Sequence, residues 1–233
     1  MKKRLLSLFL AFAMIVSMLP ATALAGDSDT VYISVSYDGQ YINDKNGVPM
    51  AYVPVDREAL AEINLDNYDL GEYKYDANGD GSYEITALHL SIYAHEELYG
   101  GSWDDVTLSG SPGSSYFAGG IFGFSENLNY YVNGTYPLAS EGWGATSDQI
   151  VVAGGDFVDI ASYSSYSFHS DPNAGFHYFM EDGDITRAYT AAADEELTVT
   201  LGRAVQGGNY TTELSPESPD TYVGADGASL PIY

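Results

Sequence analysis

Apolar and polar residues alternate near the start of the chain, over residues 30–37. The apolar positions are Val31, Ile33, Val35 and Tyr37, and the positions between them are Tyr32, Ser34 and Ser36. A period of two places these sets on opposite faces of an extended chain, so the pattern predicts a half-buried β-strand. Asp38-Gly39 marks a turn after it, and Tyr41-Ile42 can begin a return strand.

Two shorter segments follow this strand. Val48–Val55 is predicted to be extended, and its two prolines confine it to the edge of a sheet because proline cannot donate a ladder hydrogen bond. Arg57–Ile63 holds enough Ala, Leu and Glu to predict a short helix.

The main helix is predicted over Ala87–Tyr99, with Thr86 as its N-cap and Gly100-Gly101 at its end. At about 100° per residue, apolar side chains gather on one wide face, so the helix should pack that face onto a sheet. The opposite, solvated arc is expected to hold His89, Tyr93, Glu96 and Glu97. His95 falls on the apolar face, which predicts a hydrogen-bonded core histidine.

Leu128–Tyr163 carries the strongest β pattern of the chain. It predicts a strand, a turn at Asn133-Gly134, a return strand, a loop, a strand ending at Gly154-Gly155, and a nearly continuous apolar strand after it. Phe176–Met180 is predicted to be the last strand of the main domain.

The texture changes near residue 188, where alternating residues and turns predict further strands. We therefore expect the main domain over residues 26–187 and a short β-rich segment over residues 188–233. This segment is either a strand annexe of the main domain or part of a second module. We favour the second module, truncated at the end of the chain, because an immunoglobulin-like sandwich takes roughly 100 residues.

Residues 1–25 have the pattern of a secretory signal peptide. Three basic residues are followed by the apolar run Leu5–Leu19, and Ala23-Leu24-Ala25 supplies a small-x-small cleavage site. The apolar run is too short to span a bilayer comfortably, and we expect cleavage after Ala25 with no membrane span left in the mature chain. The protein is thus predicted to be secreted or to lie at a bacterial cell surface.

Charge and cysteine content narrow the range of partners. Lys and Arg number 8 against 33 Asp and Glu, for a net charge of −25. Nucleic acid is excluded as an expected partner because phosphate binding needs a basic surface, and anionic membranes would repel the chain. The sequence has no cysteine, so disulfides, a thiol nucleophile and a zinc–cysteine site are excluded.

The order of these elements resembles the transcobalamin-like C-terminal domain, a module of unknown function in exported Gram-positive bacterial proteins. Members share a Tyr-Val-Asn-Gly hairpin, here Tyr131–Gly134, and a later strand pair whose turn carries Gly-Asp and an aromatic residue or Val, here Gly155–Phe157. The resemblance spans residues 30–179. It implies an α+β fold with a β-grasp-like mixed sheet and one main helix. Cobalamin binding is not carried over, because the helical barrel that accompanies this module in vitamin carriers is missing.

One acidic loop matches the start of a calcium-binding loop. Asp76, Asn78, Asp80 and Gly81 follow the pattern D-x-N-x-D-G, with Glu84 at position 9. Position 12, where a bidentate Glu is expected, is Ala87. The loop is therefore either a weak calcium site or an Asx-turn that leads into the helix, and we expect no other cofactor.

Catalytic constellations are not found in the sequence. Serines lie outside a G-x-S-x-G context, and HEELY differs from the HExxH zinc motif. Glu141 and Asp148 lie near Trp143, as glycosidase carboxylates would, but such proximity is expected by chance in so acidic a chain. We therefore expect no enzymatic activity.

Aromatic residues are the better functional signal. The chain has 21 tyrosines, many of them beside Ser and Gly, a combination that makes adaptable contact surfaces. Trp143, Tyr131 and Tyr136 are the candidate ligand contacts. The leading hypothesis is a non-enzymatic binding or spacer module with an extracellular ligand (glycan, protein or small molecule). The alternatives are an accessory domain of a glycan-active hydrolase and a purely structural stalk unit.

Overall fold

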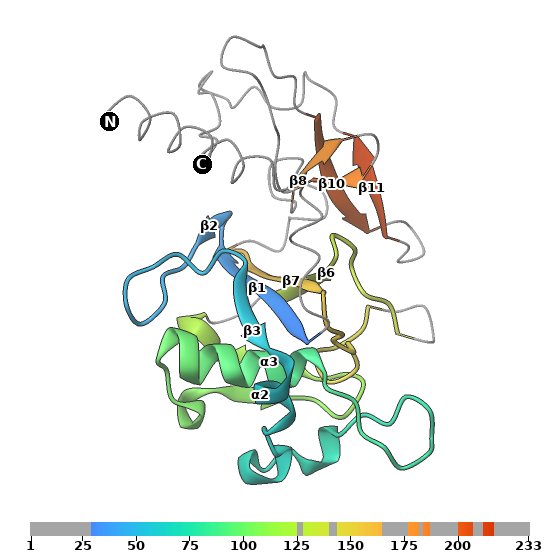
Figure 1. Cartoon of the computed structure of the whole chain (residues 1–233). Coiled ribbons are helices and arrows are strands. Elements are labelled where there is room, and N and C mark those ends of the chain that lie inside the picture. The colour runs from blue at the N-terminus through green and yellow to red at the C-terminus, as the bar shows by residue number, and fades with distance from the viewer. Residues whose placement is uncertain are drawn as a thin grey trace, which may run out of the picture.

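The computed structural model describes residues 29–124, 128–139, 144–164, 177–181, 184–186, 200–206 and 212–216 (Figure 1). The predicted signal peptide, residues 1–25, and Trp143 lie outside the described residues. No helix in the described ranges is long and apolar enough to cross a membrane.

The elements, with η marking 3-10 and π turns, follow in this order: β1 (Thr30–Tyr37), β2 (Gln40–Tyr41), β3 (Val53–Asp56), α2 (Arg57–Ala61), η2 (Leu65–Tyr68), η3 (Gly71–Tyr73), α3 (Ala87–Tyr93), η4 (Ala94–Tyr99), η5 (Trp103–Asp105), β4 (Thr107–Ser109), β5 (Tyr116–Gly119), η6 (Ile121–Gly123), β6 (Leu128–Val132), β7 (Phe157–Ser162), β8 (His177–Glu181), β9 (Asp184–Ile185), β10 (Thr200–Gln206) and β11 (Thr212–Pro216).

The main sheet has the strand order β2-β1-β7-β6, and β3 pairs with the other end of β1. The β1–β7 pair is parallel, and the other pairs are antiparallel. Helix α3 covers one face of this sheet, which we call the inner face (Figure 1). The expected α+β class, with a mixed sheet and one main helix, is confirmed.

The strand predicted over residues 30–37 is present as β1, but it is more than half-buried: Ser34 and Ser36 are 1% and 3% exposed, and Tyr37 is 41% exposed. Val31, Ile33 and Val35 are 0% exposed and pack with Val158 and Ile160 of β7 in the core under α3. Each such side chain stabilises the fold by about 1.5–3 kcal/mol through the removal of apolar surface from water. Of the extended segment predicted over Val48–Val55, only the end forms a strand, β3, which begins at Val53.

The main helix begins after Thr86 as predicted, but its first turns are buried on all sides. His89, placed by the sequence on a solvated arc, is buried, and its Nδ1 accepts the Thr86 backbone N–H at 3.1 Å. This reciprocal cap explains the error: the side chain turns back to satisfy a helix-end donor, which a face assignment ignores. The helix ends in the π turn η4, before Gly100.

The segment 144–156 corrects a second prediction. The return strand after Gly134 is reduced to a single bridge between Val132 and Thr135, and the strand expected before Gly154 is reduced to a turn and a single bridge between Val151 and Thr86. Its carbonyls serve the helix instead: Ile150 O accepts from Ala87 N at 2.8 Å. Ile150 and Val152 are buried while Val151 between them is 39% exposed, so the segment has the alternation of a strand without its ladder. The predicted turn at Asn133-Gly134 is confirmed, with φ values of 51° and 81°.

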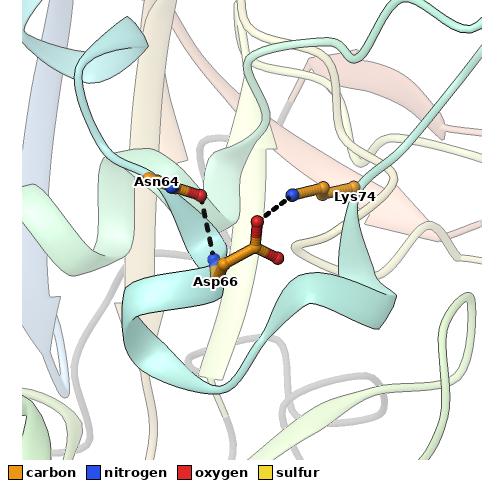
Figure 2. Close-up of polar contacts among 3 residues, drawn as sticks. All are labelled: Asn64, Asp66 and Lys74. Carbon is orange, nitrogen blue, oxygen red and sulfur yellow. Dashed lines mark hydrogen bonds and ion pairs between the residues drawn. The ribbon is translucent and has the colours of Figure 1, made fainter.

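Short-range polar contacts hold the irregular segment between α2 and the acidic loop. Figure 2 shows that Asp66 donates its backbone N–H to Asn64 Oδ1 at 3.1 Å and binds Lys74 Nζ through Oδ2 at 2.5 Å. A Cβ at Gly71 would collide with the Asp66 carboxylate, so glycine leaves room for it. The ion pair is partly exposed and contributes at most about 1 kcal/mol.

A second sheet has the order β11-β10-β8-β9. It lies on the side of the main sheet opposite α3 (Figure 1), where the Tyr178 hydroxyl of β8 reaches Asp159 of β7. The predicted domain boundary after residue 187 falls inside this sheet, since β8 and β9 precede it and β10 and β11 follow it. Strand β10, after residue 188, pairs with β8 of the predicted main domain, and the division into domains stays a prediction.

Replacement of Gly134 by Ala tests the contact between the two sheets. A Cβ at Gly134 would meet Ile185 Cδ1 at 1.9 Å, in addition to the strain of φ +81°. Gly39→Ala is the matched control, because Gly39 has φ +78° in a similar turn and nothing within 4 Å of a Cβ. In urea unfolding we expect Gly39→Ala to cost about 1 kcal/mol, and Gly134→Ala about 1 kcal/mol more.

Ile185→Val removes the clashing atom, so combined with Gly134→Ala it should recover most of that difference. Equal losses in the two glycine variants would contradict the packing of Ile185 on this turn.

Candidate functional site

The face of the main sheet opposite α3, which we call the outer face, is polar and aromatic. Register brings like positions of β1 and β7 together: Tyr32 lies beside Phe157, and Ser34 beside Asp159. Tyr131 of β6 lies on the other side of Asp159. The inner face is aliphatic and is covered by α3, so the two faces of the sheet differ both in their side chains and in the elements that pack on them.

Asp159 is the centre of the contact between the two sheets. It is 0% exposed, and its Oδ2 accepts the Tyr178 hydroxyl at 3.1 Å. Burial, and then the nearby carboxylate, raise the pKa of Tyr178 well above its ordinary value. Burial likewise raises the pKa of Tyr163 to about 12. These phenols therefore stay protonated at neutral pH, and Tyr178 remains a hydrogen-bond donor.

Of the predicted ligand contacts, the structure buries Tyr131 and leaves Tyr136 partly exposed. Tyr131 is 3% exposed and forms a small buried cluster with Ala161 and Tyr163, with the Tyr136 ring 6.0 Å away. Tyr136 is partly buried and packs over Gly144, where a Cβ would meet its ring at 2.6 Å. Tyr131 thus serves packing and does not offer its ring to a ligand. Trp143, the third candidate, lies outside the described residues.

A different set of rings lies at the edge of the outer face, and we call it the aromatic strip: Tyr41, Tyr52, Phe157 and Tyr32. Their centroids are separated in that order by 6.5, 5.8 and 4.6 Å. Tyr41 is 41% exposed, and the other three rings are partly exposed. The strip was not predicted from the sequence because its rings come from four separate places: β2, the residue before β3, β1 and β7. The alternation in β1 had already placed Tyr32 on the face opposite the core.

Tyr52 holds a strained backbone within this strip. Its φ is 52°, in the left-handed region that a bulky side chain rarely adopts, and its N–H lies 3.4 Å from Ser34 Oγ. Such a conformation costs about 1–3 kcal/mol and persists where the surroundings fix it. The strain points the Tyr52 ring edge-on to Phe157. A strained residue in a row of partly exposed rings marks this surface as the candidate site.

The predicted calcium loop has Asx-turn geometry. Asp76 accepts backbone N–H groups of Gly79, Asp80 and Gly81 at 2.6, 3.2 and 2.8 Å. These bonds lower the pKa of Asp76, with the bond from Gly81 as the largest cause. Asn78 Nδ2 lies 3.4 Å from Glu84 Oε1. Within the described ranges no group of three or more His, Cys, Asp or Glu is placed to hold a metal, and calcium binding stays a prediction.

The residues that could do acid–base chemistry make structural contacts. His95 is buried, as predicted; its Nδ1 accepts Phe122 N–H at 3.0 Å and its Nε2 lies 3.3 Å from Ser102 O. Asp148 is 2% exposed and accepts the Ser115 and Thr146 hydroxyls at 2.5 and 2.6 Å. It also accepts the Gly113 N–H at 2.8 Å, and so ties the segment 110–115, which consists of Gly, Ser and Pro and is called the Gly/Ser loop below, to the turn that caps α3.

Comparisons of the chain with protein-family models, with curated proteins and with solved structures give no match. The fold and the candidate site define an α+β domain. Its main sheet carries a second sheet and a row of aromatic rings on the outer face. The resemblance to the transcobalamin-like C-terminal domain stays a prediction.

Acidification should destabilise the fold through His89. Burial lowers the pKa of His89 from 6.5 to about 4, so the folded state holds the neutral ring. The contribution of neutral His89 to the free energy of unfolding is complete above pH 6.5. It is lost as pH falls from about 6.5 toward 4, because in this range the unfolded chain binds the proton more tightly than the folded one. The full loss is about 3 kcal/mol.

His89→Gln keeps an acceptor for the Thr86 N–H but cannot titrate. In urea unfolding at pH 7 and 4.5, we expect this variant to lose about 2 kcal/mol less on acidification than the wild type. His95 is present in both the wild type and His89→Gln, and burial lowers its pKa too, so both proteins share the loss of stability that His95 causes on acidification. The same loss in both would show that His89 carries a proton in the fold.

Asp148→Asn tests whether this carboxylate anchors the Gly/Ser loop. The amide replaces one acceptor oxygen by a donor, so Gly113 N–H or a hydroxyl loses its partner, and the cost should be about 2 kcal/mol. Asp104→Asn, at an exposed position of η5, is the control and should change stability by less than about 0.5 kcal/mol. Equal stability of the two variants by thermal unfolding would contradict the anchoring role.

Proposed function

We propose that this chain is a non-enzymatic binding module of a secreted or cell-surface bacterial protein. The observation that carries the proposal is the aromatic strip, a row of partly exposed rings on β1, β2 and β7 and just before β3. Sites built on strands hold their contacts more firmly than sites on loops, and Tyr rings offer large contact area at low entropic cost.

Two further observations support binding over catalysis. His89 and His95 are buried as acceptors of backbone N–H groups, and Asp148 is saturated by two hydroxyls and an amide. These groups are the ones that a hydrolase or transferase would need free. The signal-peptide pattern of residues 1–25 supports export. The chain needs no cofactor in this proposal, and calcium at Asp76, Asn78, Asp80 and Glu84 would be accessory.

The test is a binding survey of the mature chain, residues 26–233, against three ligand classes immobilised separately: polysaccharides, extracellular proteins and small-molecule conjugates. We expect saturable binding to one class, and no release of reducing sugar from the polysaccharides. Saturable binding accompanied by turnover would instead favour the accessory domain of a glycan-active hydrolase. If the chain binds none of the three classes, the proposal is overturned in favour of a stalk unit.

A further inference from the structure

We infer that Asn46 is a site of spontaneous covalent modification, where the asparagine converts to aspartate and isoaspartate, and that the fold protects Asn133 from the same reaction. The dipeptide Asn-Gly occurs three times in the chain, at residues 46–47, 78–79 and 133–134. The inference goes beyond the proposed function and does not depend on it. It follows from the space around each glycine and from the hydrogen bonds that hold each asparagine.

The reaction needs only the asparagine, the backbone nitrogen of the next residue and water. The Gly47 nitrogen attacks Asn46 Cγ and forms a bond with it, the Cγ–Nδ2 bond breaks, and ammonia leaves with the proton that the Gly47 nitrogen gives up. Water then opens the cyclic imide at either of its two carbonyls, so the product is aspartate or isoaspartate. Glycine favours the attack because it has no side chain to hinder the approach of its nitrogen.

The space around the glycine differs between the first and the third of these dipeptides. Gly47 is exposed, and a Cβ there would have nothing within 4 Å. Gly134 is buried, and a Cβ there would meet Ile185 Cδ1 at 1.9 Å. Formation of the cyclic imide rearranges the turn and brings the asparagine side chain over the next backbone nitrogen. The turn at Gly47 has room for this rearrangement, whereas Ile185 packs against the turn at Gly134.

The asparagine side chains differ in how firmly they are held. Asn133 is fixed at both ends of its amide: Oδ1 accepts the Phe157 N–H at 3.0 Å, and Nδ2 donates to Asp156 Oδ1 at 2.8 Å. Asn46 Nδ2 lies 3.3 Å from Asp44 Oδ2 in an exposed turn, where water competes for both groups. Rotation of the side chain toward the next nitrogen therefore breaks two good hydrogen bonds at Asn133 and one weak one at Asn46.

The dipeptide Asn78-Gly79 should react more slowly than Asn46-Gly47, although both are exposed. The attacking nitrogen of the former donates its N–H to the Asp76 carboxylate at 2.6 Å, and that of the latter donates to the neutral carbonyl of Asp44 at 3.0 Å. A short bond to a charged acceptor is the stronger of the two and holds the nitrogen in place. Backbone N–H bonds lower the pKa of Asp76, so this carboxylate is too weak a base to take the proton.

Conversion of Asn46 would loosen the turn that follows β2. Asp44 Oδ1 accepts the backbone N–H groups of Asn46 and Val48, each at 2.8 Å, and Lys45 N donates to Leu98 O of η4 at 2.8 Å. An isoaspartate lengthens the backbone between these donors, and a new carboxylate at position 46 repels that of Asp44. The modified turn therefore loses hydrogen bonds that join it to the end of the main helix.

The experiment incubates the mature chain in warm, mildly alkaline buffer and follows each asparagine by peptide mass mapping, in which loss of ammonia and gain of water mark the product. We expect Asn46 to convert first, Asn78 after it, and Asn133 slower than Asn46 by roughly tenfold or more. The same incubation in urea is the matched control. The three asparagines share one dipeptide, so they should convert there at similar rates.

Asp156→Ala removes the acceptor of Asn133 Nδ2, and it should speed the conversion of Asn133 several-fold while that of Asn46 stays as in the wild type. Thermal unfolding checks that the variant is folded, and the comparison of the three asparagines in the wild type decides the matter if it is not. Equal conversion of Asn46 and Asn133 in the folded chain would overturn the inference. So would an Asn46 that stays intact in the fold over the time in which urea-unfolded chain is converted.

Discussion

The parallel pairing of β1 with β7 is the constraint on which the rest of the structure depends. Parallel strands need a long crossover connection, because the chain must return to the end at which it started. The edge strand β3, helix α3 and strand β6 all belong to that connection, and α3 crosses the inner face. Strand β7 then lies between β1 and β6, which explains its nearly continuous apolar sequence.

The register of this pair also decides what the outer face contains. Tyr32 pairs with Phe157 and Ser34 with Asp159, so the alternation that buries Val31 on one side gathers rings and polar groups on the other. A shift by one residue would send the aliphatic set outward and the polar set into the core. The aromatic strip is thus a by-product of the same pairing that builds the core.

Local sequence patterns predicted the parts of the fold that local physics controls. Strand β1, the turn at Asn133-Gly134, the edge strand β3 and the start of the helix after Thr86 were all predictable from period, turn chemistry and capping preference. The predictions were wrong where a segment or side chain forms a hydrogen bond with a backbone N–H group at the N-terminus of the helix. Ile150 looked like a strand residue, but its carbonyl satisfies the orphan N–H of Ala87 at the helix end. His89 was assigned to solvent for the same reason, because face patterns do not count capping bonds.

The candidate site was less predictable than the fold, and the second sheet is the cause. Tyr131 looked like a surface tyrosine because nothing in its neighbourhood showed that β8 would cover it. The covering contact is polar: Asp159 is withdrawn from water and accepts the Tyr178 hydroxyl. A hydrogen bond to a charged group contributes about 1.5–3 kcal/mol, and leaving the carboxylate without it would cost more than that. The bond therefore favours one position for β8, over the centre of the outer face. In this position β8 covers Tyr131, whereas Tyr41 stays accessible at the edge of the sheet.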